Sequence, residues 1–410
     1  MEAMDSSEGG TRAAAANPAM DLAAAAQAEL AALAAAGRRR ALRPPAGRDF
    51  CSNDYLGLAR HPAIRAAMAA ALAPSAEHPA PDLALGGGSS RLIRGEDPRW
   101  AALEDRFARF CGAEAALYFP SGYAANLSWL TVLARRGDII FSDRLNHASL
   151  IDGMRLSGAE RVRLPHLDLE AYAAAFRRHA AQPGRRRLAV VESVYSMEGD
   201  RAPVAALAAL CAEHGVALVV DEAHATGVFG PNGAGWVAAA GWPPAVVAAV
   251  HTCGKAWGAA GAFVAGPAWL KDWLVNRARP FIFTTAPPPL LAVQLAAALD
   301  AAAAEPWRRE RVRAAAHRLR ERLAALGLMP PSAAENADSP IIPVLLGGDR
   351  RAVAVAERLA AAGFDVRAIR PPTVPEGTAR LRLTVHADHR DEDLDALARA
   401  LHAAVAAEAA

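Results

Sequence analysis

Short apolar runs alternate along most of the chain with longer stretches in which apolar residues recur at helical spacing. Four runs stand out: DIIF (138–141), LAVVESV (188–194), VALVV (216–220) and AVVAAVH (245–251). Strands that alternate with helices indicate crossover units, which build a largely parallel sheet covered by helices on both faces. The pattern therefore predicts an α/β fold.

The pattern also predicts two domains and an N-terminal extension. Residues 21–36 predict an alanine-rich helix that stops at Gly37, and the prolines of TTAPPP (284–289) end the region of alternating strands and helices. Beyond them we expect a small α+β domain. Its predicted elements are an arginine-rich helix over 290–326, IIPVLLG, a helix over 350–362, DVRAIR, ARLRLTV and a closing helix. The expected parts are thus a tip (1–20), a helical segment (21–49), a large domain (50–288) and a small domain (289–410).

Composition narrows the class of protein. The chain has 410 residues, 53% hydrophobic and 21% charged, and a net charge of +2, which fits a globular protein and favours no nucleic-acid partner. The arginine runs 38–40 and 185–187 are more typical of solvated surface than of a phosphate track. The four cysteines are scattered without a disulfide pattern. We therefore expect a reducing, cytoplasmic setting.

The first twenty residues lack the apolar core of a signal peptide and predict a disordered tip. Every alanine-rich run farther along is broken by charge, proline or glycine, so no stretch has the length and apolarity of a membrane span. The sequence predicts a protein without a membrane partner.

Lysine is rare in this chain, which makes one lysine conspicuous. Of the 45 lysines and arginines, only Lys255 and Lys271 are lysine, and Lys255 is the single charged residue of HTCGKAWGAAGAF (251–263). Arginine stays protonated in proteins, whereas a desolvated lysine can present a neutral amine that condenses with a carbonyl group. Lys255 is therefore a candidate nucleophile, although an ordinary loop lysine remains an alternative.

Polar residues follow each of the four apolar runs. In an open α/β sheet, ligands bind beyond the carboxyl ends of the strands, so these residues are expected to converge. They are Asp143 and His147, Ser193 and Ser196, Asp221 and His224, and Thr252 and Lys255.

A lysine and a carboxylate at one strand edge suit pyridoxal 5'-phosphate (PLP), which needs an amine for its Schiff base and an acid beside its ring nitrogen. Asp221 is the candidate acid, because a carboxylate that ends an apolar strand requires a cationic partner. His224 is a candidate for the phenolic oxygen and His147 for the ring face. A structural role remains open for each histidine, and neither has metal-ligand spacing.

A phosphate site is predicted at the start of a helix. Ser121, Gly122 and Tyr123 open the helical pattern of FPSGYAANLSWLTVLA, where free backbone N–H groups and the helix dipole favour an anion. Thr252 could add a hydroxyl group. A simple turn before a helix is the alternative. The GAGWVA segment (233–238) resembles a dinucleotide-binding loop, but no strand precedes it and no acid follows at the required distance.

Over residues 48–402 the chain resembles the α-oxoamine synthases, PLP enzymes of fold type I. This resemblance implies a large PLP-binding domain with a mostly parallel sheet and a smaller α+β domain. The matching blocks are NDYLGL, FPSGYAAN, DRLNHASLIDGMRLSGA, VVESVYSMEGD, DEAHATGVFGPNGAG, HTCGKAWGAAGAFVAG, FIFTTAPPP and AIRPPTVPEGTARLRLTV.

The resemblance implies a role for each matched residue. Lys255 would form the Schiff base, Asp221 would pair with the ring nitrogen and His147 would stack on the ring, and these three are the expected catalytic residues. The other cofactor-binding residues implied are Ser196 and His224 at the phenolic oxygen, Gly122, Tyr123 and Thr252 at the phosphate, and Thr285 at the cofactor of the partner subunit of a homodimer. The substrate-binding residues implied are Arg38, Asn53, His147, Arg370 and Thr373.

Arg370 is expected to bind the carboxylate of the amino acid substrate. It ends an apolar run and precedes Pro371 and Pro372, whose rings restrict the local backbone. A rigidly mounted guanidinium suits bidentate binding of the amino acid carboxylate. The alternatives are an ordinary surface arginine here and Arg380 as the clamp.

Two segments, AIRPPTVP and RLSGA, resemble the branch of the family that serves biotin synthesis. That branch implies L-alanine and a pimeloyl thioester as substrates, with the acyl group on coenzyme A or on an acyl carrier protein. Glycine with acetyl-CoA is the alternative enzymatic interpretation, and a PLP-binding protein without turnover is the non-enzymatic one. Three departures from the family pattern lie in a segment expected near the substrate entrance: Ser89, Arg94 and Trp100.

Overall fold

The computed structural model describes residues 18–74, 83–180, 182–329 and 336–408. The expected N-terminal tip therefore lies almost entirely outside the described residues. The first described helix, α1 (Pro18–Ala35), ends where the sequence predicted, and Gly37 follows it with a φ of +69°, a left-handed conformation that glycine adopts without strain.

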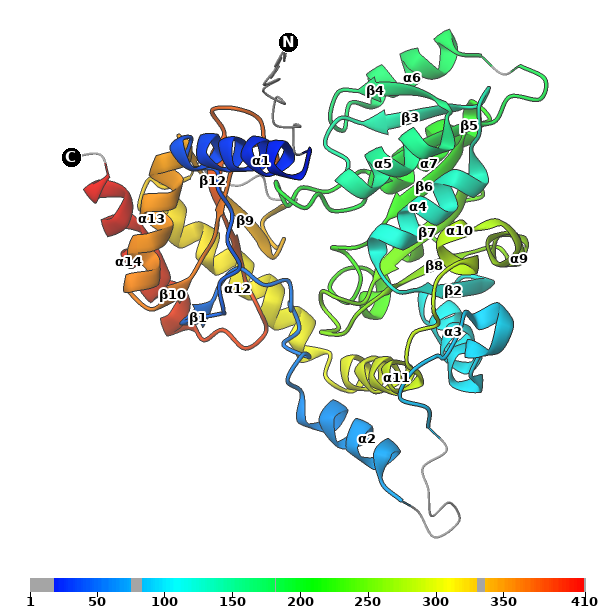
Figure 1. Ribbon diagram of the computed structural model, residues 1–410, viewed down its shortest axis with the longest axis horizontal. Coiled ribbons are helices and arrows are strands. Elements are labelled where there is room, and N and C mark those ends of the chain that lie inside the picture. The colour runs from blue at the N-terminus through cyan, green and yellow to red at the C-terminus, as the bar shows by residue number, and fades with distance from the viewer. Residues whose placement is uncertain (1–17, 75–82, 181, 330–335, 409–410) are drawn as a thin grey trace, which may run out of the picture.

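The larger of the sheets has seven strands in the order β2-β8-β7-β6-β5-β3-β4 (Figure 1). All pairings from β7 to β4 are parallel, and only β8 runs antiparallel to its neighbours. The strands are β2 (Ala115–Phe119), β3 (Ile139–Asp143), β4 (Glu160–Leu164), β5 (Arg187–Glu192), β6 (Ala217–Asp221), β7 (Val246–Thr252) and β8 (Ala262–Gly266). The largely parallel sheet predicted from the sequence is thereby confirmed.

The continuous apolar runs supply both faces of this sheet, because successive side chains of a strand point to opposite sides. In β6, Val219 packs into one apolar cluster while Leu218 and Val220 pack into another. Helices cover the first cluster from one side: α4 (Gly122–Leu133), α5 (Ala148–Ser157), α9 (Ala268–Arg277) and α10 (Arg279–Ile282). Helices α6 (Leu169–Arg178), α7 (Val204–Glu213) and α8 (Trp236–Ala239) cover the second.

A second, antiparallel sheet is built from the C-terminal part of the chain in the order β11-β12-β9. Its strands are β9 (Ile341–Gly347), β11 (Ala368–Ile369) and β12 (Ala379–Thr384). Helix α13 (Asp349–Ala361) packs against this sheet, and α14 (Asp391–Ala407) packs against α13. The N-terminal segment joins this region, because β1 (Arg48–Asp49) pairs with β10 (Phe364–Asp365). The division into a large and a small domain near residue 288 stays a prediction.

Of the remaining helices, α11 and α12 lead from the region of the larger sheet to that of the second sheet (Figure 1). Helix α11 packs against α2 and α3, and α12 packs against α14. Their bounds are α2 (Pro62–Leu72), α3 (Pro98–Cys111), α11 (Pro289–Ala304) and α12 (Trp307–Ala325), with a π-helical turn η1 (Arg91–Gly95) and a 3-10 turn η2 (Pro231–Gly233).

Two predictions about the C-terminal elements were wrong. The expected single helix over 290–326 is two helices, α11 and α12, separated at Glu305 and Pro306, because proline lacks an N–H group and its ring clashes with the preceding helical turn. The DVRAIR segment forms two short strands, β10 and β11, in different sheets.

The described residues contain no helix that is both long and apolar enough to cross a membrane. They also contain no cluster of three or more metal-ligating side chains. All four cysteines are free thiols.

Candidate active site

A cavity of about 420 Å³ opens at the carboxyl ends of β3, β5, β6 and β7. The structure brings many of the predicted site residues to its walls, although they come from distant parts of the chain. The predicted residues that line it are Asn53, Gly122, Tyr123, His147, Asp221, His224, Thr252 and Lys255.

Lys255 lies in the turn that follows β7. Its Nζ donates to Thr252 Oγ1 at 3.3 Å, and no described carboxylate lies within ion-pair distance of it. Burial lowers the pKa of the Lys255 amine, and Arg382 lowers it further by repulsion, while Asp221 and Glu192 oppose the shift. A larger fraction of the amine is therefore neutral and nucleophilic than in an exposed lysine.

Asp221 ends β6 and is 5% exposed. One carboxylate oxygen accepts from Ala223 N at 2.9 Å and the other from Asn126 Nδ2 at 2.8 Å. No described lysine, arginine or histidine forms an ion pair with it, although a buried carboxylate normally needs a cationic partner. The protonated ring nitrogen of PLP is such a partner, so this carboxylate fits the cofactor.

A second buried carboxylate, which the sequence reasoning missed, lies beside Asp221. Glu192 is the register partner of Asp221 on β5, is 3% exposed and accepts from the backbone N–H of His147 at 2.6 Å. Burial raises the pKa of Glu192 well above its ordinary value, and Asp221 adds to the rise. An acid inside the apolar run LAVVESV was the signal that could have revealed it.

Glu222 follows Asp221 but faces away from the cavity. Its side chain accepts from Ser193 Oγ and from Val237 N, both at 2.6 Å, and it is fully buried. Burial raises the pKa of Glu222 to about 7. The folded protein therefore holds a proton on Glu222 at pH values where the unfolded chain has lost it.

We expect this carboxyl group to make stability fall as pH rises from about 4.5 to about 7, because the folded state binds more protons in that window. Glu222→Gln keeps both hydrogen-bonding groups without the ionisation. As pH rises across this window, the free energy of unfolding of Glu222→Gln should therefore increase relative to that of the parent by roughly 3 kcal/mol. Urea unfolding at a series of pH values measures the difference, with exposed Glu357→Gln as the control. A constant difference between Glu222→Gln and the parent at all pH values would contradict the assignment.

His224 lies at the wall of the cavity and is held by a tyrosine. Its Nδ1 is 2.7 Å from Tyr55 Oη, which also donates to Asn53 Oδ1 at 3.1 Å. Burial lowers the pKa of His224 well below its ordinary value, and Lys255 and Arg382 add to the effect. His224 is therefore a neutral hydrogen-bonding group at physiological pH.

Arg382 on β12 completes this side of the site and was also missed from the sequence. It donates to Asn53 Oδ1 at 3.0 Å, to Tyr55 Oη at 3.5 Å and to the carbonyl oxygen of Ser196. Because β12 belongs to the second sheet, Arg382 brings the C-terminal region to the cavity. Alternating arginines in a strand that reads ARLRLTV gave no signal of which one faces the site.

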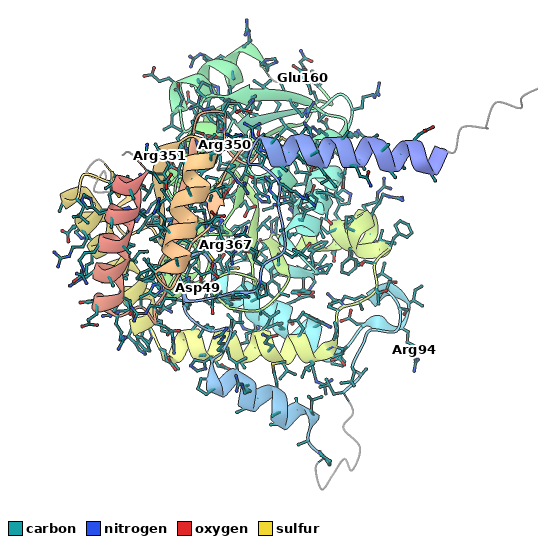
Figure 2. All side chains as sticks on the ribbon, turned by 60° about the vertical axis from the view of Figure 1, so that its left-hand side comes forward. Asp49, Arg94, Glu160, Arg350, Arg351 and Arg367 are labelled. Atoms are coloured by element: carbon teal, nitrogen blue, oxygen red, sulfur yellow. The ribbon has the colours of Figure 1, made fainter. Side chains whose placement is uncertain are left out.

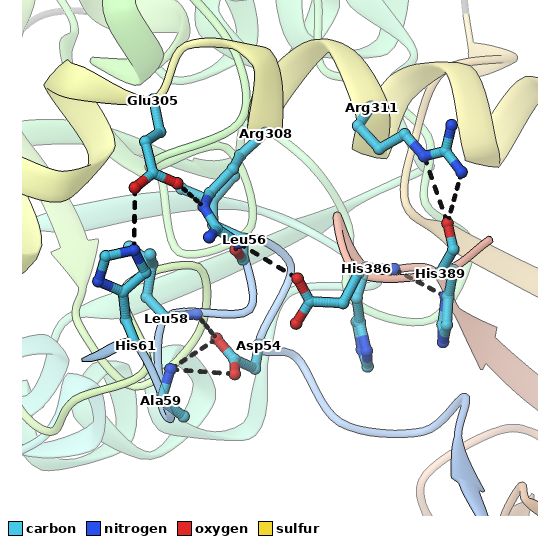
Figure 3. Close-up of polar contacts among 11 residues, drawn as sticks. Asp54, Leu56, Leu58, Ala59, His61, Glu305, Arg308, Arg311, His386 and His389 are labelled. Carbon is cyan, nitrogen blue, oxygen red and sulfur yellow. Dashed lines mark hydrogen bonds and ion pairs between the residues drawn. The ribbon is translucent and has the colours of Figure 1, made fainter. Parts of the chain in front are cut away.

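The loop that carries Asn53 and Tyr55 is fixed by contacts to the C-terminal helices (Figure 3). Asp54 accepts from Leu58 N at 2.9 Å, and His61 lies 3.0 Å from Glu305. Arg308 on α12 donates to Leu56 O at 2.8 Å. These contacts hold the loop between the two regions of the fold, so its two site residues have a defined position.

The residues predicted to bind phosphate lie at the N-terminus of α4. Ser121 caps the helix by accepting from Ala124 N at 3.0 Å, and Gly122 and Tyr123 begin its first turn. A Cβ atom on Gly122 would lie only 2.7 Å from Thr252 Cγ2, so a side chain there would close this end of the cavity. The Tyr123 side chain is exposed and donates to Asp152. Helical N–H groups beside the Thr252 hydroxyl suit the phosphate of PLP.

Five residues to which the resemblance gave a binding role do not line this cavity. Ser196 lies next to it through the contact of its carbonyl with Arg382, and Thr285 is exposed on the segment that pairs with Ser89 through Ala286. Arg38 forms ion pairs with Asp349 and Glu376. The roles predicted for these residues and for Arg370 and Thr373 stay predictions.

Arg370 lines a separate cavity of about 590 Å³ between the N-terminal segment, α13 and β11. Its guanidinium donates to Gly37 O, and Arg40 lies 3.5 Å from Thr373 Oγ1. Figure 2 shows Arg367, another wall residue, beside the helix that carries Arg350 and Arg351. The charged residues of the wall are Arg39, Arg40, Arg43, Arg367 and Arg370 against Glu357 and Asp365.

One of the three departures in the entrance segment was placed wrongly. Trp100 is fully buried and stacks on Tyr118 with ring centroids 4.3 Å apart, so it belongs to the core and not to an entrance. Ser89 Oγ accepts from Arg94 N at 3.0 Å, and Arg94 itself is exposed.

Comparisons with known proteins agree with this geometry. Residues 47–401 match the family model of aminotransferase class I and II. The chain is 48% identical to the 8-amino-7-oxononanoate synthase of Anaeromyxobacter dehalogenans (strain 2CP-1) over 92% of this chain and 94% of the relative. The 8-amino-7-oxononanoate synthase of Anaeromyxobacter sp. (strain K) gives the same identity and coverage.

Solved structures show the same fold. A serine palmitoyltransferase from S. paucimobilis with bound PLP and myriocin superposes with a TM-score of 0.84 at 28% identity, over 95% of this chain and 99% of that one. The 8-amino-7-oxononanoate synthase of Francisella tularensis gives 0.71 at 26% identity, over 89% and 99%. The resemblance to fold type I PLP enzymes is thereby confirmed, and the chain belongs to the aminotransferase class I and II family and, within it, to the 8-amino-7-oxononanoate synthases.

Proposed function

We propose that this protein condenses L-alanine with a pimeloyl thioester, giving 8-amino-7-oxononanoate, CO2 and the free thiol, as a step of biotin synthesis. The observation that carries the proposal is one cavity that joins Lys255, Asp221, His147 and His224 to a helix N-terminus. The names of the relatives at 48% identity support the substrate pair. We propose further that the protein acts in the cytoplasm as a homodimer.

PLP supplies an aldehyde that takes up the amino group of alanine and a protonated ring that accepts electrons from the α-carbon. Lys255 would hold the cofactor and then, once displaced by alanine, use its free Nζ to remove the α-proton. Asp221 would keep the ring nitrogen protonated through a charge-assisted hydrogen bond. Gly122, Tyr123 and Thr252 would hold the phosphate at the α4 N-terminus.

Arg382 is the better-placed group for the alanine carboxylate. It contacts Asn53, a wall residue of the Lys255 cavity, and it is close enough to lower the pKa of Lys255. Arg380, the alternative considered from the sequence, is paired with Glu198 at 2.8 Å. Arg370 lines the arginine-rich cavity instead, where the distal carboxylate of the pimeloyl chain would find an excess of guanidinium groups.

Two matched variants separate these assignments. We expect Arg382→Lys to bind cofactor but to lose roughly 10- to 150-fold in kcat/KM for alanine, because a point charge replaces a bidentate guanidinium at about 1.5 to 3 kcal/mol. Arg370→Lys should leave the alanine constants nearly unchanged and raise KM for the pimeloyl thioester. The reverse pattern would return the alanine carboxylate to Arg370, as predicted from the sequence.

A substrate panel tests the proposed function. Purified protein loaded with PLP is assayed with alanine or glycine against pimeloyl-CoA, pimeloyl-acyl carrier protein and acetyl-CoA, with release of thiol as the readout. We expect turnover with alanine and a pimeloyl thioester to exceed every other pair. Preference for glycine and acetyl-CoA would assign a different α-oxoamine synthase activity, and no turnover with any pair would favour a binding protein.

A further inference from the structure

A buried chain of hydrogen bonds runs from the core of α4 to the histidine of the cavity. Its members are Trp129, Asn126, Ser149 and His147, and the first three are at most 2% exposed. The bonds are 3.0 Å from Trp129 Nε1 to Asn126 Oδ1, 2.9 Å from Asn126 Nδ2 to Ser149 Oγ and 2.8 Å between Ser149 Oγ and His147 Nδ1. None of the first three was identified from the sequence.

The donor and acceptor roles along this series of hydrogen bonds are set by Trp129. An indole N–H can only donate, so Asn126 must present its carbonyl oxygen to Trp129 and its NH2 group to the other side. The two N–H bonds of that group then reach two acceptors, Ser149 Oγ and Asp221 Oδ2. The carboxylate of Asp221 also requires a donor. The contacts with Trp129 and Asp221 therefore specify the same orientation of the Asn126 amide.

The two contacts between Ser149 and His147 determine which ring nitrogen of His147 carries the proton. The backbone N–H of Ser149, which can only donate, points at His147 Nδ1 at 3.2 Å, so Nδ1 must be an acceptor. Ser149 Oγ already accepts from Asn126, which leaves its own hydrogen free for the same nitrogen. A neutral ring must therefore carry its proton on Nε2, for which the described residues offer no partner.

We propose that Asn126 and Ser149 are positioning residues that hold His147 as the neutral Nε2–H tautomer while fixing the carboxylate of Asp221. One amide group thus orients both the histidine and the acid of the cavity. The Nε2–H group is left as the free donor of His147, and we infer that it serves the acyl substrate or the cofactor at the cavity wall. That last use rests on the proposed function, whereas the tautomer does not.

Other titratable groups around His147 also shift the protonation equilibrium of its ring. The titratable groups that face it are Asp152, Glu192, Asp221, His224 and Lys255. Burial lowers the pKa of His147 and Lys255 lowers it further, while Asp221 and Asp152 oppose the shift. Donation to Nδ1 by Ser149 stabilises the neutral ring and so acts in the same direction as burial.

The test is nuclear magnetic resonance of the PLP-loaded protein labelled with 15N-histidine, with the His147 signals identified from their loss in His147→Gln. We expect a protonated Nε2 and an unprotonated Nδ1. Ser149→Ala should raise the apparent pKa of His147 by about one pH unit, a tenfold change in proton affinity, and mix the tautomers. Ser149→Thr, which keeps the hydroxyl group, should restore the parent spectrum.

Ser128→Ala is the matched control, because Ser128 is a fully buried serine on α4 that takes no part in the hydrogen bonds leading to His147. Its hydroxyl group donates to Ala124 O instead. It should leave the His147 signals unchanged. A proton on Nδ1 in the parent, or equal effects of Ser128→Ala and Ser149→Ala, would overturn the proposal. Because these signals are read without turnover, a failed substrate assay would count against the proposed function and not against the tautomer.

Discussion

Replacing Lys255 by arginine should abolish the condensation while leaving the fold intact. Arginine keeps the positive charge but cannot release its proton, so it neither condenses with an aldehyde nor removes the α-proton of alanine. We expect kcat to fall by at least 10² to 10⁴, roughly the contribution of a positioned base. Lys255→Ala should behave alike. Steady-state turnover and borohydride fixation of the cofactor to the protein measure the two losses.

The sequence itself supplies the matched control. Lys271 is the only other lysine of the chain; it pairs with Glu104 at 3.1 Å, and neither residue lines the Lys255 cavity. Lys271→Arg should retain both turnover and borohydride fixation. Fixation that survives in Lys255→Arg, or disappears in Lys271→Arg, would show that Lys255 is not the covalent site.

Asp221→Asn should produce the second large loss. An amide has nearly the shape of the carboxylate but no charge, so it cannot hold the ring nitrogen protonated. Its NH2 group would also oppose either Ala223 N or Asn126 Nδ2, both of which donate to Asp221. We expect cofactor to remain bound while kcat falls by roughly 150- to 5,000-fold, the scale of about 3 to 5 kcal/mol for a broken buried charge pair.

Cofactor absorbance and turnover, measured on the same preparation, separate binding from catalysis in this variant. Glu222→Gln is the control, because it makes the same chemical change at the next residue, on a side chain bound to Ser193 and Val237. It should keep most of the activity. Near-normal turnover in Asp221→Asn would remove Asp221 from the mechanism.

Much of the fold could be predicted because the strands of the parallel sheet are continuous apolar runs. VALVV is an example: it packs Val219 into one layer and Leu218 and Val220 into the other, so the whole run must be apolar. The strands β2, β4 and β8 were not predicted. In β4 the sequence ERVRL is largely exposed at the sheet edge, so burial left no apolar pattern to detect.

The helix expected over 290–326 failed for a different reason. Helix-forming residues lie on both sides of Glu305 and Pro306, and in the sequence only the proline marks the break between the two helices. The break has a function in the fold, because Glu305 is left free to bind His61 and Arg308 to bind Leu56 O (Figure 3). Tertiary contacts of this kind are invisible to periodicity.

The site residues that directly follow a predicted strand could be identified from the sequence. Asp221 and Lys255 each follow an apolar run, and parallel pairing brings such ends to one edge. Asn126, Ser149, Glu192 and Arg382 were missed because their roles depend on partners from other elements. Arg382 is the clearest case: nothing in ARLRLTV distinguishes it from Arg380, and only the contact with Asn53 does.

The most direct test of the proposed reaction is the fate of the alanine carbons. Protein loaded with PLP is supplied with a pimeloyl thioester and with either [1-13C]- or [3-13C]-alanine, and the product is weighed by mass spectrometry. We predict that the carboxyl label leaves as CO2 and the methyl label appears in 8-amino-7-oxononanoate, with one thiol released per product. Retention of the carboxyl label, or absence of a condensation product, would contradict the account.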